Sequence, residues 1–390
     1  MEVLWVFLRL GLTSFGGPVA HLGFFREELV SRRRWLSERS YADLVALCQF
    51  LPGPASSQVG LGLGMLRAGY AGALAAWVGF TLPSAIALVW VALGLGVYAE
   101  QLADGLLQGL KVAALAVVVQ AVWGMARNLC PDTPRVTLMA IATCLVLLLP
   151  TVWGQIGVIV GAGVVGLLLF RPAAQDGPAE HWSVPVSRRA GAGWLALFLI
   201  LLVGLPILTT LVPSQTLAVV DAFYRAGSLV FGGGHVVLPL LQAEVVPTGW
   251  VDEEMFLAGY GVTQAVPGPL FTFAAFLGSV MTSAPSGWLG ALICLLAIFA
   301  PSFLLVMGAL PFWAQLRESY RMRAALMGIN AAVVGILLAA LYDPISLSAI
   351  IGAETFALAL LALVALMFWR WPPWLVVLLC SLLGWATGLL

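Results

Sequence analysis

The chain has 390 residues, of which 62% are hydrophobic and only 9% are charged. A soluble globular domain carries about 25% charged residues, so this composition excludes a water-soluble fold. The 18 basic and 18 acidic side chains give a net charge of zero, which excludes the basic surface typical of nucleic-acid-binding proteins. At about 20 apolar residues per crossing, the sequence predicts about ten to thirteen segments in the lipid bilayer.

The first residues carry an acidic side chain, Glu2, before the apolar run, and no basic cluster or small-residue cleavage site follows the usual pattern. We therefore expect mature sequence and not a signal peptide. Five cysteines lie singly in apolar surroundings, and three histidines lie far apart in the sequence. These spacings indicate no disulfide framework, metal site or haem motif, so we expect no cofactor.

The apolar runs are predicted to be helices, because lipid leaves the backbone no other partners outside a closed barrel and alternating ten-residue strands are absent. We expect an all-α polytopic membrane protein. One polar linker, 171–192, divides the chain near its middle. The runs are 3–25, 41–66, 68–98, 106–126, 136–149, 152–170, 193–212, 217–243, 255–281, 286–313, 322–342, 347–369 and 374–390.

The two sides of the linker repeat one another. At an offset of 216, the identical residues are Phe7, Arg9, Gly11, Phe15, Gly16 and Gly17, which recur as Phe223, Arg225, Gly227, Phe231, Gly232 and Gly233. The offset is 215 for Gln49, Pro52, Gly53 and Pro54, which recur as Gln264, Pro267, Gly268 and Pro269. It is 218 for Pro83 and Ser84, which recur as Pro301 and Ser302, and 219 for Gly109, which recurs as Gly328. The repeat predicts a first membrane repeat at 1–170, a cytoplasmic linker with a connecting transmembrane helix at 171–216, and a second membrane repeat at 217–390.

Basic residues in matched connections are biased oppositely in the two halves. The first connection holds five arginines between Arg26 and Arg39, whereas its counterpart holds none. After the third segment the bias reverses, with none in the first half and three arginines between Arg317 and Arg323 in the second. Because basic loops stay in the cytoplasm, we predict an inverted-topology repeat, which is typical of secondary transporters. All basic loops become cytoplasmic if the first two segments of each half are re-entrant, which predicts nine complete crossings.

Two prolines flanking a glycine interrupt the second segment of each half, at Pro52-Gly53-Pro54 and Pro267-Gly268-Pro269. Proline removes a backbone donor and glycine admits positive φ, so a continuous helix cannot pass. The helix that restarts there presents unpaired N–H groups and about half a positive charge, which favours an anion. The residues that we predict to bind it here are Gln49, Pro52, Gly53, Pro54, Ser56, Ser57, Gln264, Pro267, Gly268, Pro269 and Thr272. The alternative is a pair of proline kinks that serve helix packing.

Glycine runs interrupt the first segment of each half. Such runs permit a re-entrant turn or the close approach of backbone to a ligand, although small residues also mediate plain helix packing. Their repeated placement favours a binding role, and His235 directly after the second run is a candidate gating or coupling group or a structural histidine. The predicted site residues in these runs are Phe15, Gly16, Gly17, Phe231, Gly232, Gly233 and Gly234.

Arg9, Arg225 and Lys111 are basic residues that lie well inside apolar runs. An arginine at mid-membrane costs about 2.5 to 3.5 kcal/mol, so each needs a partner. One hypothesis is that both guanidiniums converge on one anion, whose oxygens they bind in fork geometry. The alternative is that Arg9 reaches the membrane interface and that Glu2 and Asp221 are local partners. Lys111, which corresponds to Asn330 in the second half, is a candidate gate or a structural partner of an acid such as Glu354.

No nucleophile, base and orienting group recur at catalytic spacing, and no phosphate-binding loop is present, so we do not expect an enzyme. The set of motifs, Phe-Gly-Gly-Pro near the start, Gln-x-x-Pro-Gly-Pro in both halves and Phe-Gly-Gly-Gly-His in the second, resembles the long-chain chromate ion transporter family. The resemblance spans essentially the whole chain. It implies a multi-pass protein of a bacterial inner membrane that exports chromate, with sulfate as the isosteric alternative substrate. A homodimer is a further possibility.

Energetics suggests how such export would be driven. Moving a dianion outward along an inside-negative potential gains about 4.6 kcal/mol per 100 mV, so export needs no coupled ion. We therefore predict electrogenic efflux. Two other function classes stay open: an anion channel, distinguished by its unitary currents, and a membrane enzyme acting on lipid-linked phosphates, distinguished by its product.

Overall fold

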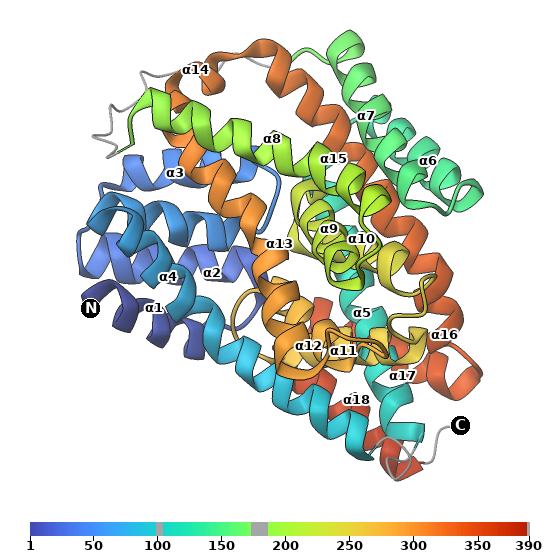
Figure 1. The fold of residues 1–390 in the computed structure, drawn as a ribbon. Coiled ribbons are helices and arrows are strands. Elements are labelled where there is room, and N and C mark those ends of the chain that lie inside the picture. Colours follow the sequence, from blue (N-terminus) through green and yellow to red (C-terminus); the bar gives the residue numbers. More distant parts are fainter. Residues whose placement is uncertain (99–103, 173–185, 388–390) are drawn as a thin grey trace.

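The computed structural model describes residues 1–98, 104–172 and 186–387, and every regular element in these ranges is a helix (Figure 1). The first half comprises α1 (Glu2–Thr13), α2 (Gly17–Phe25), the π-helix η1 (Arg26–Arg32), α3 (Glu38–Phe50), α4 (Ala55–Tyr98), α5 (Asp104–Leu129), α6 (Thr133–Leu148) and α7 (Val152–Leu169). A connecting helix follows, α8 (Arg188–Leu211). The second half comprises α9 (Gln215–Leu229), η2 (Gly234–Val236), α10 (Val237–Val245), α11 (Glu253–Ala265), η3 (Leu270–Thr272), α12 (Phe273–Val280), α13 (Gly287–Ala309), η4 (Leu310–Phe312), α14 (Trp313–Glu318), α15 (Tyr320–Ala340), η5 (Leu341–Ser346), α16 (Leu347–Ala349), α17 (Ala353–Met367) and α18 (Pro373–Thr387).

The predicted interruptions are confirmed in the first two segments of each half. α1 ends at Thr13 and α2 begins at Gly17, while α3 ends at Phe50 and α4 begins at Ala55. In the second half the breaks fall between α9 and η2 and between α11 and η3. Gly16 and Gly53 lie at positive φ in these breaks, as glycine but few other residues can.

Six helices in the described ranges are long and apolar enough to cross a membrane, so the chain is a multi-pass membrane protein. Ala68 and Gly69 are non-helical and divide α4 into two helices close to the predicted boundary at residue 67. The predicted segment 41–66 is therefore two helices, α3 and the first part of α4. Most of the polar linker, 173–185, and residues 99–103 lie outside the described residues.

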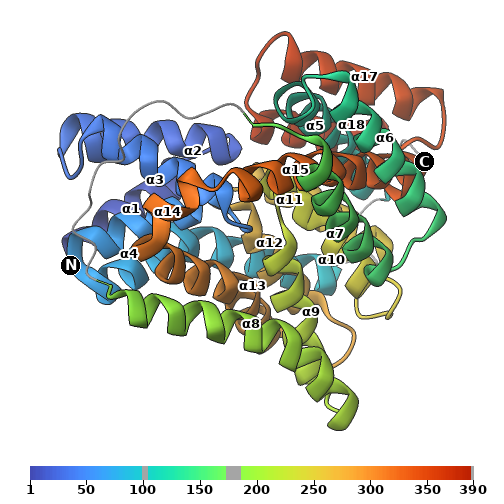
Figure 2. The ribbon, with the colours of Figure 1, turned by 90° about the horizontal axis from the view of Figure 1, so that it is seen from above.

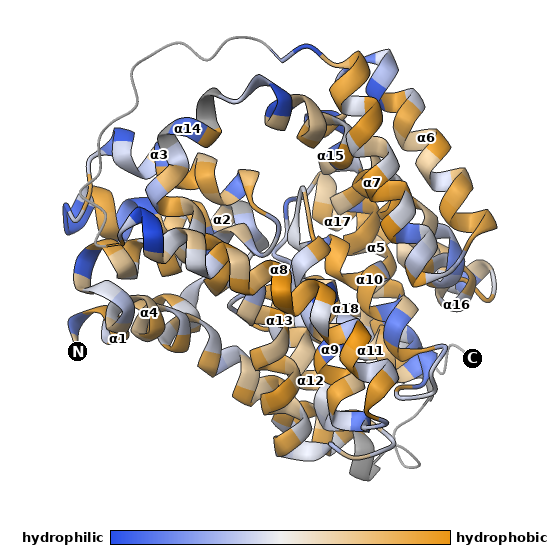
Figure 3. Ribbon diagram, turned by 45° about the horizontal axis from the view of Figure 1, so that its top comes forward, coloured by the Kyte–Doolittle hydropathy of each residue, from blue (hydrophilic) through white to orange (hydrophobic). Residues whose placement is uncertain are grey.

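The connecting helix α8 lies on the outside of the molecule, where it crosses the upper part of Figure 1 below α14, and it is mostly apolar in Figure 3. It is the least buried of the six candidate spans. Side chains such as Leu199, Ile200 and Val203 are exposed along it. An exposed apolar helix of 24 residues is suited to contact with lipid.

Each half completes its packing with the last helix of the other half. α5 packs along α18, and α15 packs along α7, an exchange that Figure 2 shows from above. At the first contact, Gly109 lies against the Cys380 carbonyl, and at the second its repeat partner Gly328 lies against the Ala162 carbonyl. Small residues are required where helix backbones approach this closely.

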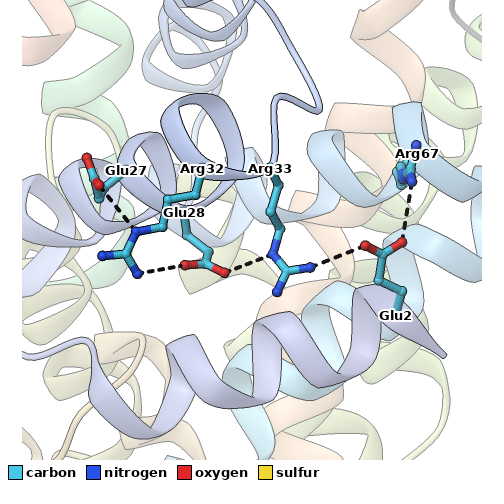
Figure 4. Close-up of polar contacts among 6 residues, drawn as sticks. All are labelled: Glu2, Glu27, Glu28, Arg32, Arg33 and Arg67. Carbon is cyan, nitrogen blue, oxygen red and sulfur yellow. Dashed lines mark hydrogen bonds and ion pairs between the residues drawn. The ribbon is translucent and has the colours of Figure 1, made fainter.

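A chain of ion pairs holds the loop after α2 against α1 and the bend in α4 (Figure 4). Arg33 contacts Glu28 at 2.8 Å and Glu2 at 3.2 Å. Glu2 also contacts Arg67 at 3.3 Å, next to the non-helical residues of α4. The hydrogen bond from Arg33 holds the pKa of Glu28 below its usual value. The remaining links join Arg32 to Glu27 and to Glu28.

Replacement of Gly328 by alanine is expected to destabilise the folded protein by about 1 to 3 kcal/mol, because the added methyl group would collide with the Ala162 carbonyl. Gly157→Ala is the control, since nothing lies within 4 Å of its added methyl group. The measurement is thermal unfolding in detergent micelles. Equal melting temperatures for both variants would contradict the close approach of α15 to α7.

Candidate functional site

A cavity of about 650 Å³ lies between the two halves, at the breaks in their first two segments. Its wall is built from equivalent residues of the two halves, such as Gly53 and Gly268 or Gln49 and Gln264. The C-terminal half of α5 closes one side and contributes Gln120, the stretch around Gly124, and Asn128.

Four helices begin at this cavity. The starts of α2 and α4 contribute Gly17 and Ala55, and the starts of η2 and η3, which lead into α10 and α12, contribute Gly234 and Leu270. The first N–H groups of a helix have no partner within it, and the aligned peptide dipoles place about half a positive charge at each start. Each of these starts therefore presents N–H donors to the cavity.

The broken segments of the two halves are tied together by two reciprocal backbone hydrogen bonds. The Gly53 N–H donates to the Val230 carbonyl at 2.7 Å, and the Gly268 N–H donates to the Ser14 carbonyl at 3.0 Å. Ser14 and Val230 are related by the repeat offset of 216. Each hydrogen bond therefore joins the second break of one half to the first break of the other.

Gly53 and Gly268 must be glycine for two reasons. Their φ angles are +122° and +107°, which other residues rarely adopt. A Cβ atom on Gly53 would also lie 2.6 Å from Ser302 Oγ, and one on Gly268 would lie 2.7 Å from Ser84 Oγ. These glycines form a wall one residue thick between the cavity and the buried side chains behind it.

The side chains around the cavity are neutral: among its described lining residues none is Asp, Glu, Lys or Arg. Gln264 Nε2 has no hydrogen-bond partner among the described residues, and Gln49 is exposed to the cavity. His235 Nδ1 lies 2.6 Å from the Tyr260 hydroxyl, which orients its ring. Amide donors and helix starts together suit a ligand that carries negative charge and accepts hydrogen bonds.

The structure brings many of the predicted site residues together. Those that line the cavity are Gly16, Gly17, Gln49, Gly53, Gly232, Gly233, Gly234, His235, Gln264 and Gly268. Others belong to the same breaks and first turns but do not line it, namely Phe15, Pro52, Pro54, Ser56, Ser57, Phe231, Pro267, Pro269 and Thr272. Arg9, Arg225 and Lys111 are also not among the lining residues.

Arg225 is held by two carboxylates. Its guanidinium contacts Asp221 at 2.9 Å, as predicted, and donates to both carboxylate oxygens of Glu244, at 3.0 and 2.9 Å. All three side chains are nearly buried. Glu244 corresponds to Glu28 at the repeat offset of 216, and Arg9 acts electrostatically on Glu28 in the first half. Each half therefore has an arginine before its first break and a glutamate after it.

Lys111 contacts Glu254 at 2.9 Å, so its partner is Glu254 and not Glu354, the acid named from the sequence. Glu254 lies in the first turn of α11, whose last turn carries Gln264 at the cavity. The neighbouring Glu253 accepts a hydrogen bond from Ser348 at 2.6 Å. These contacts fix the start of α11 against α5 and α16.

Sequence reasoning missed several lining residues. Asn128 and Gln120 on α5 and Asn330 on α15 line the cavity, together with Cys48 and its repeat partner Thr263. A polar amide inside an apolar run is the available signal for Gln120 and Asn330, whereas Asn128 lies just beyond the run 106–126. Cys48 and Thr263 give no such signal, because they differ from each other and each occurs singly.

Arg225→Ala is expected to destabilise the protein by about 3 to 5 kcal/mol, because it leaves Asp221 and Glu244 buried without their partner. The matched control is Arg9→Ala, which removes an exposed arginine at the equivalent position and should cost less than about 1 kcal/mol. Combining Arg225→Met with Asp221→Asn and Glu244→Gln should recover stability. Unfolding midpoints in detergent measure all three, and a stable Arg225→Ala protein would contradict this structural role.

Comparisons with known proteins agree on one family. Its profile, described as chromate transporter, matches residues 1–167 and 217–385. The chain is 29% identical to the chromate transport protein of Pseudomonas aeruginosa over 98% of this chain and 91% of that one. It is 28% identical to the probable chromate transport protein of Synechococcus elongatus, over 92% and 88% of the two chains. It is 24% identical to the chromate transport protein of Cupriavidus metallidurans, over 94% and 87%.

No solved structure matches the chain. The family profile covers both halves and leaves out the linker and α8. The similarity to whole relatives extends over nearly the full length. The chain belongs to the chromate transporter family.

Proposed function

We propose that the protein transports chromate, and that the anion binds in the cavity between the halves. Chromate is a tetrahedral dianion with four acceptor oxygens. The observation that carries the proposal is the convergence of four helix starts on a cavity whose described lining has no carboxylate. Membership of the chromate transporter family supports the choice of substrate.

The backbone can donate hydrogen bonds to such a substrate. Each of the four helix starts presents N–H groups that have no partner within the helix. Amide groups of Gln49, Gln264 and Asn330 are placed to replace water around the oxygens.

We infer that the two halves form an inverted repeat with nine complete crossings. The opposite bias of basic residues supports this, as do the reciprocal hydrogen bonds of Gly53 and Gly268 and the exchanged packing of α5 and α15. In this topology Arg127, at the C-terminal end of α5, is cytoplasmic. The cavity is lined by the C-terminal half of α5 and therefore lies nearer the cytoplasm.

Cysteine labelling tests the topology. Single cysteines at Arg67 and Asp104 should react with a membrane-impermeant thiol reagent from opposite faces, because one complete crossing separates them. The background lacks the five native cysteines. Labelling of both positions from the same face would rule out the inverted repeat as described.

We propose that transport is directed outward across a bacterial inner membrane and is driven by the membrane potential. A dianion gains about 4.6 kcal/mol per 100 mV on leaving an inside-negative cell. Lys111 and its partner Glu254 link α5 to the segment that carries Gln264, which suits a coupling role during this movement. Sulfate has the same shape and charge and is the second candidate substrate for the same cavity.

Chromate uptake into everted vesicles measures export, because the cytoplasmic face of their membrane is on the outside. We expect uptake to rise with an inside-positive vesicle potential and to fall when valinomycin and potassium collapse it. Competition by sulfate reports on the second substrate. Uptake that persists unchanged without the potential, while a pH gradient remains, would exclude potential-driven export.

Gln49→Glu and Gln264→Glu should each reduce chromate uptake more than tenfold, because a negative charge would then face the dianion in the cavity. Gln215→Glu is the control, since this glutamine lies at the exposed start of α9 and does not line the cavity. Uptake assays in vesicles with matched protein levels compare the three. Undiminished uptake in both cavity variants would remove the binding site from this cavity.

A further inference from the structure

A group of buried polar side chains lies behind the wall of the cavity. Each is at most 2% exposed, and each has a polar atom without a hydrogen-bond partner among the described residues. Buried polar atoms in proteins nearly always have a partner, so several in one region point to a ligand. We call the group the polar cluster; the atoms are Ser14 Oγ, His21 Nε2, Ser57 Oγ, Gln58 Oε1, Thr81 Oγ1 and Ser302 Oγ.

Gly53 alone separates two members of the polar cluster, Gln58 and Ser302, from the cavity. Gly53 lines the cavity, and its Cα has Ser302 Oγ and Gln58 Nε2 directly behind it, so that an added Cβ would lie 2.6 Å from each. Gly268, on the other side of the wall, bonds through its N–H to the carbonyl of Ser14. A small displacement of these two breaks would join the cavity to the cluster.

The second half shows that the fold does not need these polar groups. At the repeat offsets, Ser14 and His21 correspond to Val230 and Val237, and all four side chains are buried. Gln58 and Thr81 correspond to Phe273 and Phe299, which are also buried. Thr272 is the repeat partner of Ser57, and its hydroxyl donates a hydrogen bond to the Pro269 carbonyl at 2.7 Å. Five of the six unpartnered groups therefore belong to the first half, and the sixth, Ser302, lies in the second half and corresponds to Ser84.

The chemistry of the cluster suits an anion better than a cation. Ser57 and Gln58 lie in the first turns of α4, where the helix dipole favours negative charge. The four hydroxyl groups supply donors. His21 Nδ1 lies 3.4 Å from Ser56 Oγ, and the ring also interacts with the Ser14 backbone. Gln58 Oε1 is an acceptor, since Gln58 Nε2 donates to the Pro52 carbonyl at 2.6 Å. None of the six residues is a carboxylate, which a bound cation would favour.

We propose that the polar cluster is a second, occluded subsite for the transported oxyanion, one residue beyond the cavity. The proposal rests on the proposed function. The anion enters the cavity, and movement of the Gly53 and Gly268 breaks passes it to the hydroxyl groups of the polar cluster, three of which belong to the first half and one to the second. The two halves then have different tasks, although their folds correspond.

The test replaces residues of the polar cluster by the residues found at the equivalent positions of the second half. Ser14→Val combined with His21→Val should leave the dissociation constant for chromate within about twofold of wild type, because the cavity is intact. Chromate flux should fall at least tenfold. Equilibrium dialysis of the purified protein measures binding, and proteoliposomes under an imposed potential measure flux.

Ser57→Ala with Thr81→Val is the second variant, and it should show the same separation of binding from flux. Ser228→Ala is the control for loss of a buried hydroxyl, since this hydroxyl already bonds the Tyr224 carbonyl at 2.7 Å in α9. Wild-type flux in both cluster variants would overturn the subsite and leave ordered water as the occupant. Loss of binding together with flux would also overturn it, whereas absence of chromate flux in wild type would instead remove the proposed function.

Discussion

The backbone of an interrupted helix must find hydrogen-bond partners where lipid offers none. Here the breaks of the two halves satisfy each other: Gly53 bonds Val230, and Gly268 bonds Ser14. This requirement places the four interrupted segments around one point and leaves their restarting helices aimed at a common space. The cavity, the N–H donors of its helix starts and its thin glycine wall all follow from these reciprocal hydrogen bonds. Ionised side chains are not needed to build it.

The breaks themselves could be predicted, because a Pro-Gly-Pro sequence cannot continue a helix and its repetition at Gly53 and Gly268 is visible without coordinates. The arginines could not be placed in the same way. Arg225 meets Glu244 only because α10 returns beside α9, and the sequence does not show which helices come together. Similarly, Lys111 meets Glu254 through the packing of α11 against α5. Contacts between separate segments depend on tertiary geometry, which local pattern does not encode.

The two halves share a fold, but several of their buried side chains differ at equivalent positions. Close helix contacts recur at Gly109 and Gly328, where backbone spacing allows no alternative. Behind the cavity wall, however, Ser14 and His21 correspond to valines in the other half. Positions that set the approach of helices, and cavity residues such as Gln49 and Gln264, are thus identical in both copies, whereas most positions of the polar cluster differ. The proposed second subsite uses positions at which the two halves differ.

The exchange of terminal helices between the halves has a consequence for assembly. α5 rests on α18, and α15 rests on α7, so neither half can bury its own fourth segment. If the polypeptide were cut on either side of α8, each fragment would present an unmatched glycine-lined groove to lipid. The fragments would then have to find one another before either became stable. Continuity of the chain through α8 therefore contributes mainly by keeping two mutually dependent bundles at high local concentration.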